Sequence, residues 1–233
     1  RPAAWWIAVT AACGAGLSGT SAASAANGES VWTFSGYAEP YVVVERSRSP
    51  GGQRAGFLYN FDRAGQPDLN LAMARVAYEG PRLRGGLAVA AGTYMEANYA
   101  AEPSGLRHLF EGWLGIASDD GRVTADLGVF PSHIGFESAI GVDNWTLTRS
   151  LAAENSPYFE SGLRIAWRSE DGRWSAAGLV LNGWQRIRRP DSHEPAIGHQ
   201  LTWTPSERLT INSSSFIGSD KPRQERRMRY FHD

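Results

Sequence analysis

The chain has 233 residues, of which 42% are apolar and 11% aromatic, and its formal net charge is −1. This near-neutral charge gives no support for a nucleic-acid partner, which would call for a basic surplus on one face. After residue 26 there is no run of about 18 apolar residues, which excludes a transmembrane helix from that part. Cys13 is the only cysteine, so the remainder of the chain has no disulfide and no cysteine-based metal site.

The N-terminal 25 residues have the pattern of an export signal. A positively charged start is followed by an apolar tract of small residues over 3–17, and Ala23-Ser24-Ala25 fits the small-x-small rule for cleavage. The alternative is a disordered Ala-rich tail. We predict a signal peptide over 1–25 and one domain over 26–233.

Polar and apolar residues then alternate in short tracts, which is the pattern of β-strands with two different faces. The alternation is clear over 82–97, 122–130 and 158–169. Weaker copies cover 31–46, 68–79, 107–118, 173–185, 196–204 and 208–217, and 227–233 resembles the opening of another strand. No tract keeps the spacing of an amphipathic helix. The sequence therefore predicts nine strands and the beginning of a tenth.

The joints between these tracts alternate in length. Tight charged turns are expected at 79–82, 119–122, 170–173 and 205–208, and long irregular loops at 47–67, 98–106, 131–157, 186–196 and 218–226. Short turns at one end and long loops at the other are typical of an up-and-down antiparallel β-barrel of the bacterial outer membrane. We therefore predict an all-β transmembrane barrel.

Aromatic residues recur near the ends of the expected strands, among them Trp32, Tyr94, Phe159, Trp174 and Trp203. This placement favours the aromatic girdles that barrels have at the two membrane interfaces. The alternative is ordinary β-core packing, because strands favour aromatic residues in any case.

The chain stops within the last expected strand, at 229–233. An open sheet edge cannot lie in lipid, because its backbone groups would lack partners. We therefore expect the barrel to be incomplete at its C-terminus, with two or more strands missing.

The loop over 131–157 is rich in apolar residues for an exposed segment, and we expect Phe136, Ile140, Trp145, Leu147 and Leu151 to be buried in the lumen. A loop folded inward would narrow a pore, and its charged side chains would then select what passes. The alternative is an outward loop packed on itself. The candidate pore-lining or constriction residues are His133, Glu137, Asp143, Arg149, Glu154, Glu160, Arg164, Arg168 and Asp126.

Charges of both signs fall on the expected inner face of the strands. Besides Asp126, Glu160, Arg164 and Arg168, they include Glu39, Arg84, Glu96 and Glu111. Mixed signs predict ladders of ion pairs that either stiffen the wall or tune ion preference, and we favour the structural role. The near balance argues against strong ion selectivity from the strands alone.

Catalysis finds little support in the sequence. Ser132 and His133 are adjacent, and adjacent side chains on an extended chain point in opposite directions, so they do not form a nucleophile–base pair. The histidines show no metal-ligand spacing with Cys, Asp or Glu, and no phosphate-binding loop occurs. We predict no catalytic residue, no metal site and no cofactor.

Several segments resemble the OmpL-like family of outer-membrane β-barrel porins. They are 57–63 (FLYNFDR), 92–94 (GTY), 97–100 (ANYA), 130–139 (FPSHIGFESA), 145–150 (WTLTRS), 153–160 (AENSPYFE), 181–186 (LNGWQR) and 227–231 (RMRYF). The resemblance implies a Gram-negative outer-membrane barrel of about a dozen strands with a porin role, of which this chain would be a truncated part. It supplies no catalytic residues.

The leading functional hypothesis is a passive channel for small hydrophilic solutes or ions. The alternatives are a non-conducting barrel with a surface-binding or structural role, an outer-membrane enzyme that modifies lipid, and a soluble secreted β-sandwich. The expected partners are outer-membrane lipid, the solutes themselves and the barrel assembly machinery. A homo-oligomer is conceivable, although no residue pattern marks an interface.

Overall fold

The computed structural model describes residues 30–45, 50–189, 194–219, 221, 225 and 227–233. The expected signal peptide over 1–25 lies outside these residues. The described chain forms one sheet of ten strands in the order β1 to β10, in which each strand pairs antiparallel with the next along the chain. The strands are β1 (Val31–Val42), β2 (Pro67–Glu79), β3 (Leu83–Ala91), β4 (Leu109–Ala117), β5 (Val123–Pro131), β6 (Phe159–Arg168), β7 (Trp174–Leu181), β8 (Ala196–Ser206), β9 (Leu209–Gly218) and β10 (Arg229–His232).

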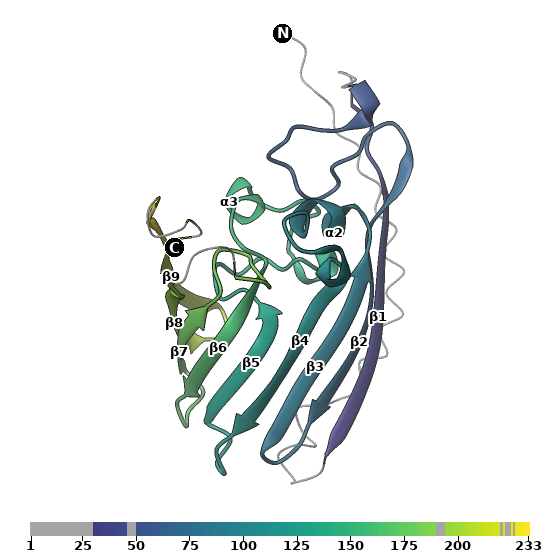
Figure 1. Cartoon of the computed structure of the whole chain (residues 1–233). Coiled ribbons are helices and arrows are strands. Elements are labelled where there is room, and N and C mark those ends of the chain that lie inside the picture. The colour runs from purple at the N-terminus through teal and green to yellow at the C-terminus, as the bar shows by residue number, and fades with distance from the viewer. Residues whose placement is uncertain (1–29, 46–49, 190–193, 220, 222–224, 226) are drawn as a thin grey trace.

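The strands lie side by side in a curved sheet whose two ends differ (Figure 1). Tight turns join the strands at one end. At the other end the long joints carry the helices α2 (Thr93–Asn98) and α3 (Leu151–Glu154) and the 3-10 turns η1 (Pro50–Gly52), η2 (Ser104–Leu106) and η3 (Gly141–Asp143). None of the described helices has the length and apolar character needed to cross a bilayer. The predicted alternation of short and long joints is confirmed.

Two of the tight turns use the same local chemistry. In the turn after β4, the Asp120 carboxylate accepts hydrogen bonds from the backbone N–H of Arg122 at 3.1 Å and from the Ser118 hydroxyl at 2.5 Å. The turn after β6 repeats this with Asp171, which accepts from the Arg173 N–H at 3.1 Å and the Ser169 hydroxyl at 2.6 Å. Each turn therefore satisfies its own polar groups with residues a few positions away.

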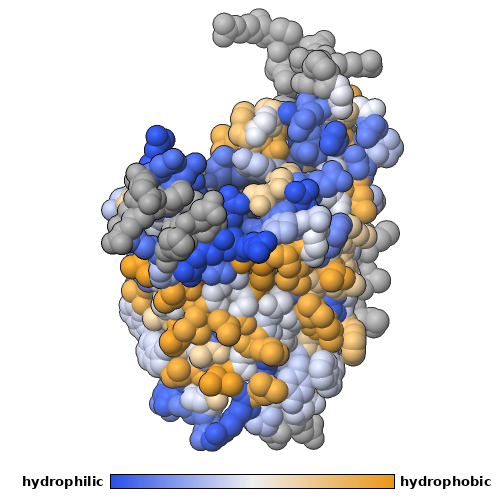
Figure 2. All heavy atoms as spheres, viewed as in Figure 1, coloured by the Kyte–Doolittle hydropathy of each residue, from blue (hydrophilic) through white to orange (hydrophobic). Residues whose placement is uncertain are grey.

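The two faces of the sheet differ as the alternation predicts. Large apolar side chains on the outer face are 37–69% exposed, and they are Leu83, Leu87, Val89, Leu114, Ile116, Leu127, Leu163, Ile165, Val180, Ile197, Leu201 and Ile211. On the side seen in Figure 2, apolar surface gathers at mid-height over the strands, with hydrophilic surface above and below it. The inner face carries the charged and buried polar residues. An apolar band between polar ends is the surface that a lipid-embedded sheet presents.

The aromatic residues divide between the two predicted roles. Trp174 and Trp203 stack on the outer face at 5.4 Å between ring centroids, and Trp32 lies 4.9 Å from the Tyr78 ring. These residues lie close to the short-turn end, where a girdle is expected. Another group lies instead in two buried clusters at the long-loop end, and its members are Tyr94, Tyr99, Phe130, Tyr158, Phe159, Trp184 and Phe216. For that group the alternative of core packing is the correct one.

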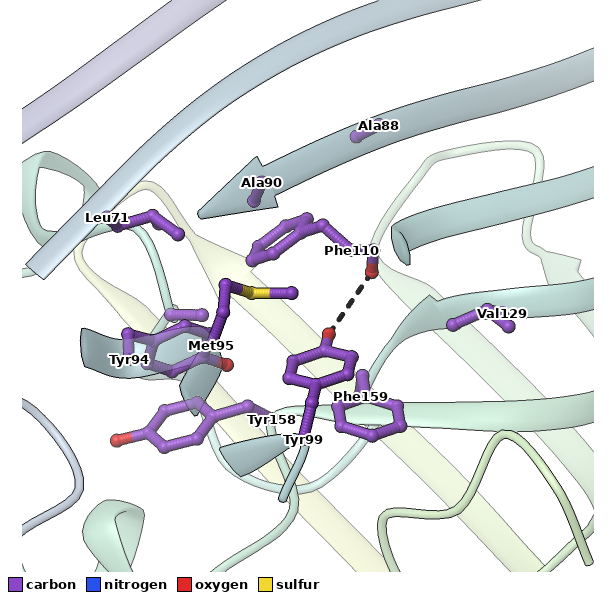
Figure 3. Close-up of a cluster of buried hydrophobic side chains, with 11 residues drawn as sticks. Leu71, Ala88, Ala90, Tyr94, Met95, Tyr99, Phe110, Val129, Tyr158 and Phe159 are labelled. Carbon is purple, nitrogen blue, oxygen red and sulfur yellow. Dashed lines mark hydrogen bonds between the residues drawn. The ribbon is translucent and has the colours of Figure 1, made fainter. Parts of the chain in front are cut away.

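The first of these clusters fixes α2 against the sheet (Figure 3). Tyr94 and Met95 of α2 pack among residues of β2, β3 and β4, and Tyr99 stacks on Phe159 of β6 at 4.2 Å between ring centroids. The predicted strand over 82–97 was wrong in this part, because the strand ends at Ala91 and 93–98 is helical. The predicted extensions of β1 to residue 46 and of β7 to residue 185 were also wrong, since these strands end at Val42 and Leu181.

Candidate functional site

The inner face of the central strands carries two neighbouring sets of ion pairs. Asp126 of β5 lies between two arginines, with its carboxylate 2.8 Å from the Arg164 guanidinium of β6 and 3.5 Å from the Arg84 guanidinium of β3. On the neighbouring strands, Glu111 of β4 pairs with Arg75 of β2 at 3.1 Å. The ion pairs therefore form two sets, one between β2 and β4 and one across β3, β5 and β6, so that all five adjacent strands take part, as the mixed charges predict.

The acids and the bases of these sets differ in depth. The side chains of Asp126 and Glu111 are 0% and 4% exposed, whereas those of Arg75, Arg84 and Arg164 are 24–39% exposed. Each carboxylate needs space beside its strand, and a glycine of the neighbouring strand provides it. A methyl group on Gly115 would collide with the Asp126 carboxylate, and one on Gly86 would collide with that of Glu111.

Aromatic rings hold two of the guanidinium groups in place. Arg84 lies over the Trp113 ring at 4.9 Å and Arg164 over the Phe130 ring at 5.0 Å, both within the range of a cation–π contact. The indole N–H of Trp113 also donates to Glu111 at 2.5 Å. The arginines are thus oriented by a ring and a carboxylate at once, which fixes them more firmly than an exposed ion pair would.

The loop that follows β5 is anchored across the inner face by His133. Its Nδ1 lies 2.6 Å from the Glu160 carboxylate of β6, and its Nε2 lies 2.8 Å from the Ser215 carbonyl oxygen of β9. The His133 carbonyl oxygen accepts from the Gln200 side chain of β8 and the Ser214 hydroxyl of β9, each at 2.9 Å. The start of this loop is therefore seated on strands β8 and β9.

The anchor depends on a glycine and on the protonation of the ring. A Cβ on Gly198 of β8 would lie 2.7 Å from His133 Nε2, so a side chain there would displace the ring. Both partners of the ring, a carboxylate and a carbonyl oxygen, are acceptors, which favours the doubly protonated imidazolium. Burial lowers the pKa of His133, but the hydrogen bond and the charge of Glu160 outweigh burial and raise the pKa above its usual value.

The loop then reaches the opposite edge strand. Gly141 lies so close to the Glu39 carboxylate of β1 that a Cβ there would collide with it, and the same Cβ would lie 3.2 Å from the Tyr37 hydroxyl oxygen. Glu39 is itself held by the Tyr37 hydroxyl at 2.9 Å and the Asn70 amide at 2.6 Å. Because β1 and β8 are separated by six strands in the sheet, the segment 133–141 passes across the inner face.

The end of the loop is tied to the loop between β1 and β2. The Glu154 carboxylate of α3 accepts from the backbone N–H groups of Tyr59 at 2.6 Å and Asn60 at 3.2 Å, and from the Asn60 amide at 3.0 Å. Burial raises the pKa of Glu154, and the hydrogen bonds from Tyr59 and Asn60 act against this rise. Two loops that are distant in sequence are thereby joined through one carboxylate.

Arg149 ties the loop to itself. Its Nε donates to the Ser138 carbonyl oxygen at 2.9 Å and its Nη2 donates to the Ala139 carbonyl oxygen, while its guanidinium lies 5.9 Å from the rings of Phe61 and Tyr158. The side chain is almost completely buried. Its cation therefore serves the loop and is not presented to solvent.

The other predicted site residues have looser surroundings. Glu137 accepts from the backbone N–H of Ser150 at 2.8 Å, and Asp143 is exposed and makes only a long contact of 3.5 Å with the Ser138 hydroxyl. Arg168 of β6 is exposed on the inner side of the sheet. Glu96, which we expected on a strand, is exposed on α2.

The expectation that the large apolar residues of the loop are buried was mostly wrong. Trp145 is completely exposed, Phe136 is 88% exposed, and Leu147 and Leu151 are also exposed, whereas Ile140 packs against the cluster around Tyr94. The residues that hold the loop against the sheet are chiefly polar or small, because their partners on the inner face are carboxylates, carbonyls and amides. The bulky residues lie on the side of the loop that is turned away from these partners.

A recess of about 350 Å³ lies between the loop and the inner face of β2 to β4. Its wall combines the aromatic cluster with Arg75 and Glu111 from the sheet and Glu137 and Asp143 from the loop. Sequence reasoning missed Arg75 and Gln200, although both stand at inward positions of strands that were expected. The alternation of polar and apolar residues could have identified them, but only once the register between neighbouring strands is known.

Ser132 and His133 do not form a nucleophile–base pair, and the described part of the chain has no group of side chains suited to a metal ion. The Ser132 hydroxyl accepts from the Ile134 N–H at 3.1 Å, while the His133 ring is turned to Glu160 and Ser215. No three His, Cys, Asp or Glu side chains among the described residues are grouped as metal ligands.

Comparison with family models of known proteins gives a match over most of the chain. The family model described as "Putative beta-barrel porin-2, OmpL-like" matches residues 32–233. Searches of the curated proteins and of the solved structures give no match. The family implies an outer-membrane location, and membership of a porin family favours a protein that is not an enzyme. Since the match covers nearly all of the chain, and the sheet has the outer apolar band and inner polar face of such barrels, the chain belongs to the OmpL-like family of β-barrel porins.

Proposed function

We propose that the protein is a porin that lets small hydrophilic solutes or ions diffuse passively across the outer membrane through a polar lumen. We further propose that the loop over 131–157 constricts this lumen. The path of the loop carries the proposal: His133 is held on β8 and β9, and Gly141 lies against Glu39 of β1. A segment that crosses from one side of the inner face to the other reduces the cross-section available to a solute.

The route to the membrane is part of the same proposal. A signal peptide over 1–25 would export the chain, and the barrel assembly machinery would insert it into outer-membrane lipid. A homo-oligomer is compatible with this function, since each barrel would conduct by itself. Diffusion down a gradient requires no cofactor.

Single-channel conductance in a planar bilayer tests the proposal. The wild-type protein is expected to give stable current steps, and His133→Ala, which removes the ring's contacts with Glu160 of β6 and Ser215 of β9, is expected to give larger or noisier steps. Trp145→Ala is the matched control, because this residue is in the same loop and completely exposed. Equal conductance in all three proteins would count against the constriction. A folded protein that gives no steps would contradict the porin itself.

A second candidate function is favoured by the exposed apolar residues at the long-loop end. Phe57, Phe136, Val142, Trp145 and Leu151 are each more than half exposed. Apolar side chains gathered at the loop end are suited to binding another molecule at the surface. A barrel that is folded, inserted and silent in the bilayer would favour this surface-binding role over the channel.

A further inference from the structure

The charged groups of the inner wall are arranged in layers, and this arrangement bears on which solutes the lumen accepts. The inference rests on the proposed porin function. Asp126 is completely buried at the wall, and the two arginines that hold it, Arg84 and Arg164, are both partly exposed. Two cations thus share one anion, and the anion lies behind them.

Glu111 and Arg75 show the same arrangement, in which the carboxylate is buried and the guanidinium lies over it. The Glu111 side chain is 4% exposed beneath Arg75, which is 39% exposed. The Trp113 indole N–H occupies the same carboxylate oxygen as Arg75, at 2.5 Å. A solute near the wall therefore meets guanidinium groups first, because the carboxylates are covered.

Arg168 extends this basic layer toward the short turns. It follows Arg164 on the inner face of β6 by four residues and is exposed. Within the described residues, its guanidinium has no hydrogen-bonded or ion-paired partner. It therefore contributes a cation that no wall carboxylate neutralises.

Arg84, Arg164 and Arg168 together line a recess of about 760 Å³ at the short-turn end, and Gln200 of β8 also lines it. Three acids also line it, and each lies within 4 Å of an arginine, although the arginine beside Glu79 is Arg84, which also pairs with Asp126. Asp120 pairs with Arg122 at 2.7 Å, Asp119 pairs with Arg82, and Glu79 lies 3.9 Å from Arg84. The acids at this mouth are thus compensated locally, whereas Arg168 is not.

We propose that this layer makes the lumen selective for small anions, with carboxylates and phosphates as the chemical class that it favours. Guanidinium groups offer paired N–H donors that match carboxylate and phosphate oxygens. Arg84 and Arg164 are held in position by aromatic rings and by the buried Asp126, so their guanidinium groups keep their place at the wall. The total charge of the wall is close to balanced, and the order of the layers, more than the sum of charges, sets the preference.

The reversal potential of the wild-type channel in a potassium chloride gradient tests the inference. We expect chloride to permeate on the order of three times better than potassium, because a positive potential of about half a kT per unit charge enriches the anion and depletes the cation. Arg168→Glu is expected to abolish or invert this preference, and Arg168→Gln is expected to reduce it. Arg208→Gln, in the exposed turn between β8 and β9, removes one charge outside the recess and is expected to leave the reversal potential unchanged.

The outcomes separate this inference from the function on which it rests. Clear conductance with equal or cation-selective permeability would overturn the anion preference and leave the porin intact. An anion-selective channel whose reversal potential is the same in Arg168→Glu would overturn the assignment to this layer. Absence of conductance from folded, inserted protein would overturn both. Heat-modifiable migration in gel electrophoresis establishes folding for each variant, and the exposed position of Arg168 makes both substitutions compatible with the fold.

Discussion

The two ends of the sheet are held together in different ways. At the short-turn end, side-chain hydrogen bonds such as those of Asp120 and Ser118 join residues two to five positions apart. At the long-loop end, His133 and Glu154 bind partners that are 27 to 95 positions away. Local contacts close each turn on itself, and exposed ion pairs such as Arg82 with Asp119 link neighbouring turns. Distant contacts make the loops depend on one another and on the register of the whole sheet.

Glu154→Ala is expected to have the largest effect on stability, and it tests whether the contacts at the long-loop end are separate from those at the short-turn end. It leaves the N–H groups of Tyr59 and Asn60 without their acceptor, at a cost of about 2–3 kcal/mol. Because the effect is confined to the loop end, faster hydrogen exchange is expected over 58–61 and 150–155, with the turns unchanged. Asn155→Ala, at the exposed neighbouring position, is the control. Equal exchange in both variants would contradict the assigned role of Glu154.

The pairing of His133 with Glu160 gives the next largest effect. A double-mutant cycle with His133→Ala and Glu160→Gln, followed by urea unfolding in lipid vesicles, is expected to show a coupling energy of about 1–2 kcal/mol. The pair is buried and joined at 2.6 Å, so the coupling should exceed that of an exposed ion pair. Arg173 and Asp171, an exposed turn pair at 4.0 Å, provide the comparison and are expected to couple weakly. Equal coupling in the two pairs would refute the contrast between the ends.

Gly121→Ala probes the local chemistry of the turns. Gly121 has φ +67°, a left-handed conformation that costs an L-residue about 1 kcal/mol. The loss should appear as a lower urea midpoint with unchanged exchange in the loop over 131–157. Gly178→Ala serves as the control, because nothing lies within 4 Å of a Cβ at that position of β7. Loss of loop protection in Gly121→Ala would show that the two ends are not independent.

The pH dependence of the loop end gives the smallest effect. The pKa of His133 is raised in the folded protein. Burial lowers this pKa, but Glu160 and, more weakly, Asp233 raise it by more than burial lowers it. The stabilisation from the protonated ring is therefore complete below the unfolded pKa of about 6.5 and is lost as the pH rises through the higher folded value. Urea midpoints of the wild type and His133→Gln between about pH 5 and 9 are expected to converge at high pH. Parallel curves would exclude the imidazolium.

The contrast between the ends also explains what the sequence could predict. The alternation along 122–130 and 158–169 identifies strands and faces, because a side chain's face depends only on its position in its own strand. The ladders around Asp126 follow from that pattern once neighbouring strands are aligned. The tight turns could be predicted equally well from the sequence, because Asp-Gly-Arg sequences supply their own hydrogen-bond partners.

The loop and α2 were less predictable, for the same physical reason. Residues 93–98 alternate well enough to resemble a strand, and their helix is fixed by packing of Tyr94 and Met95 against β2, β3 and β4. The inward path of the loop depends on Gly198 and Ser215, which are distant from His133 in sequence. Apolar content suggested that Phe136 and Trp145 anchor the loop, whereas polar groups do so. No local pattern specifies partners of this kind.

The contacts of His133 with β8 and β9 have a consequence for the order in which the protein folds. The ring and its carbonyl oxygen are held by Gln200, Ser214 and Ser215, and all three are synthesised long after the loop itself. The segment that begins at residue 132 can reach its final position only after β8 and β9 have paired. Its docking is therefore a late step of folding, and protection of the loop against protease reports that the strands behind it are already in register.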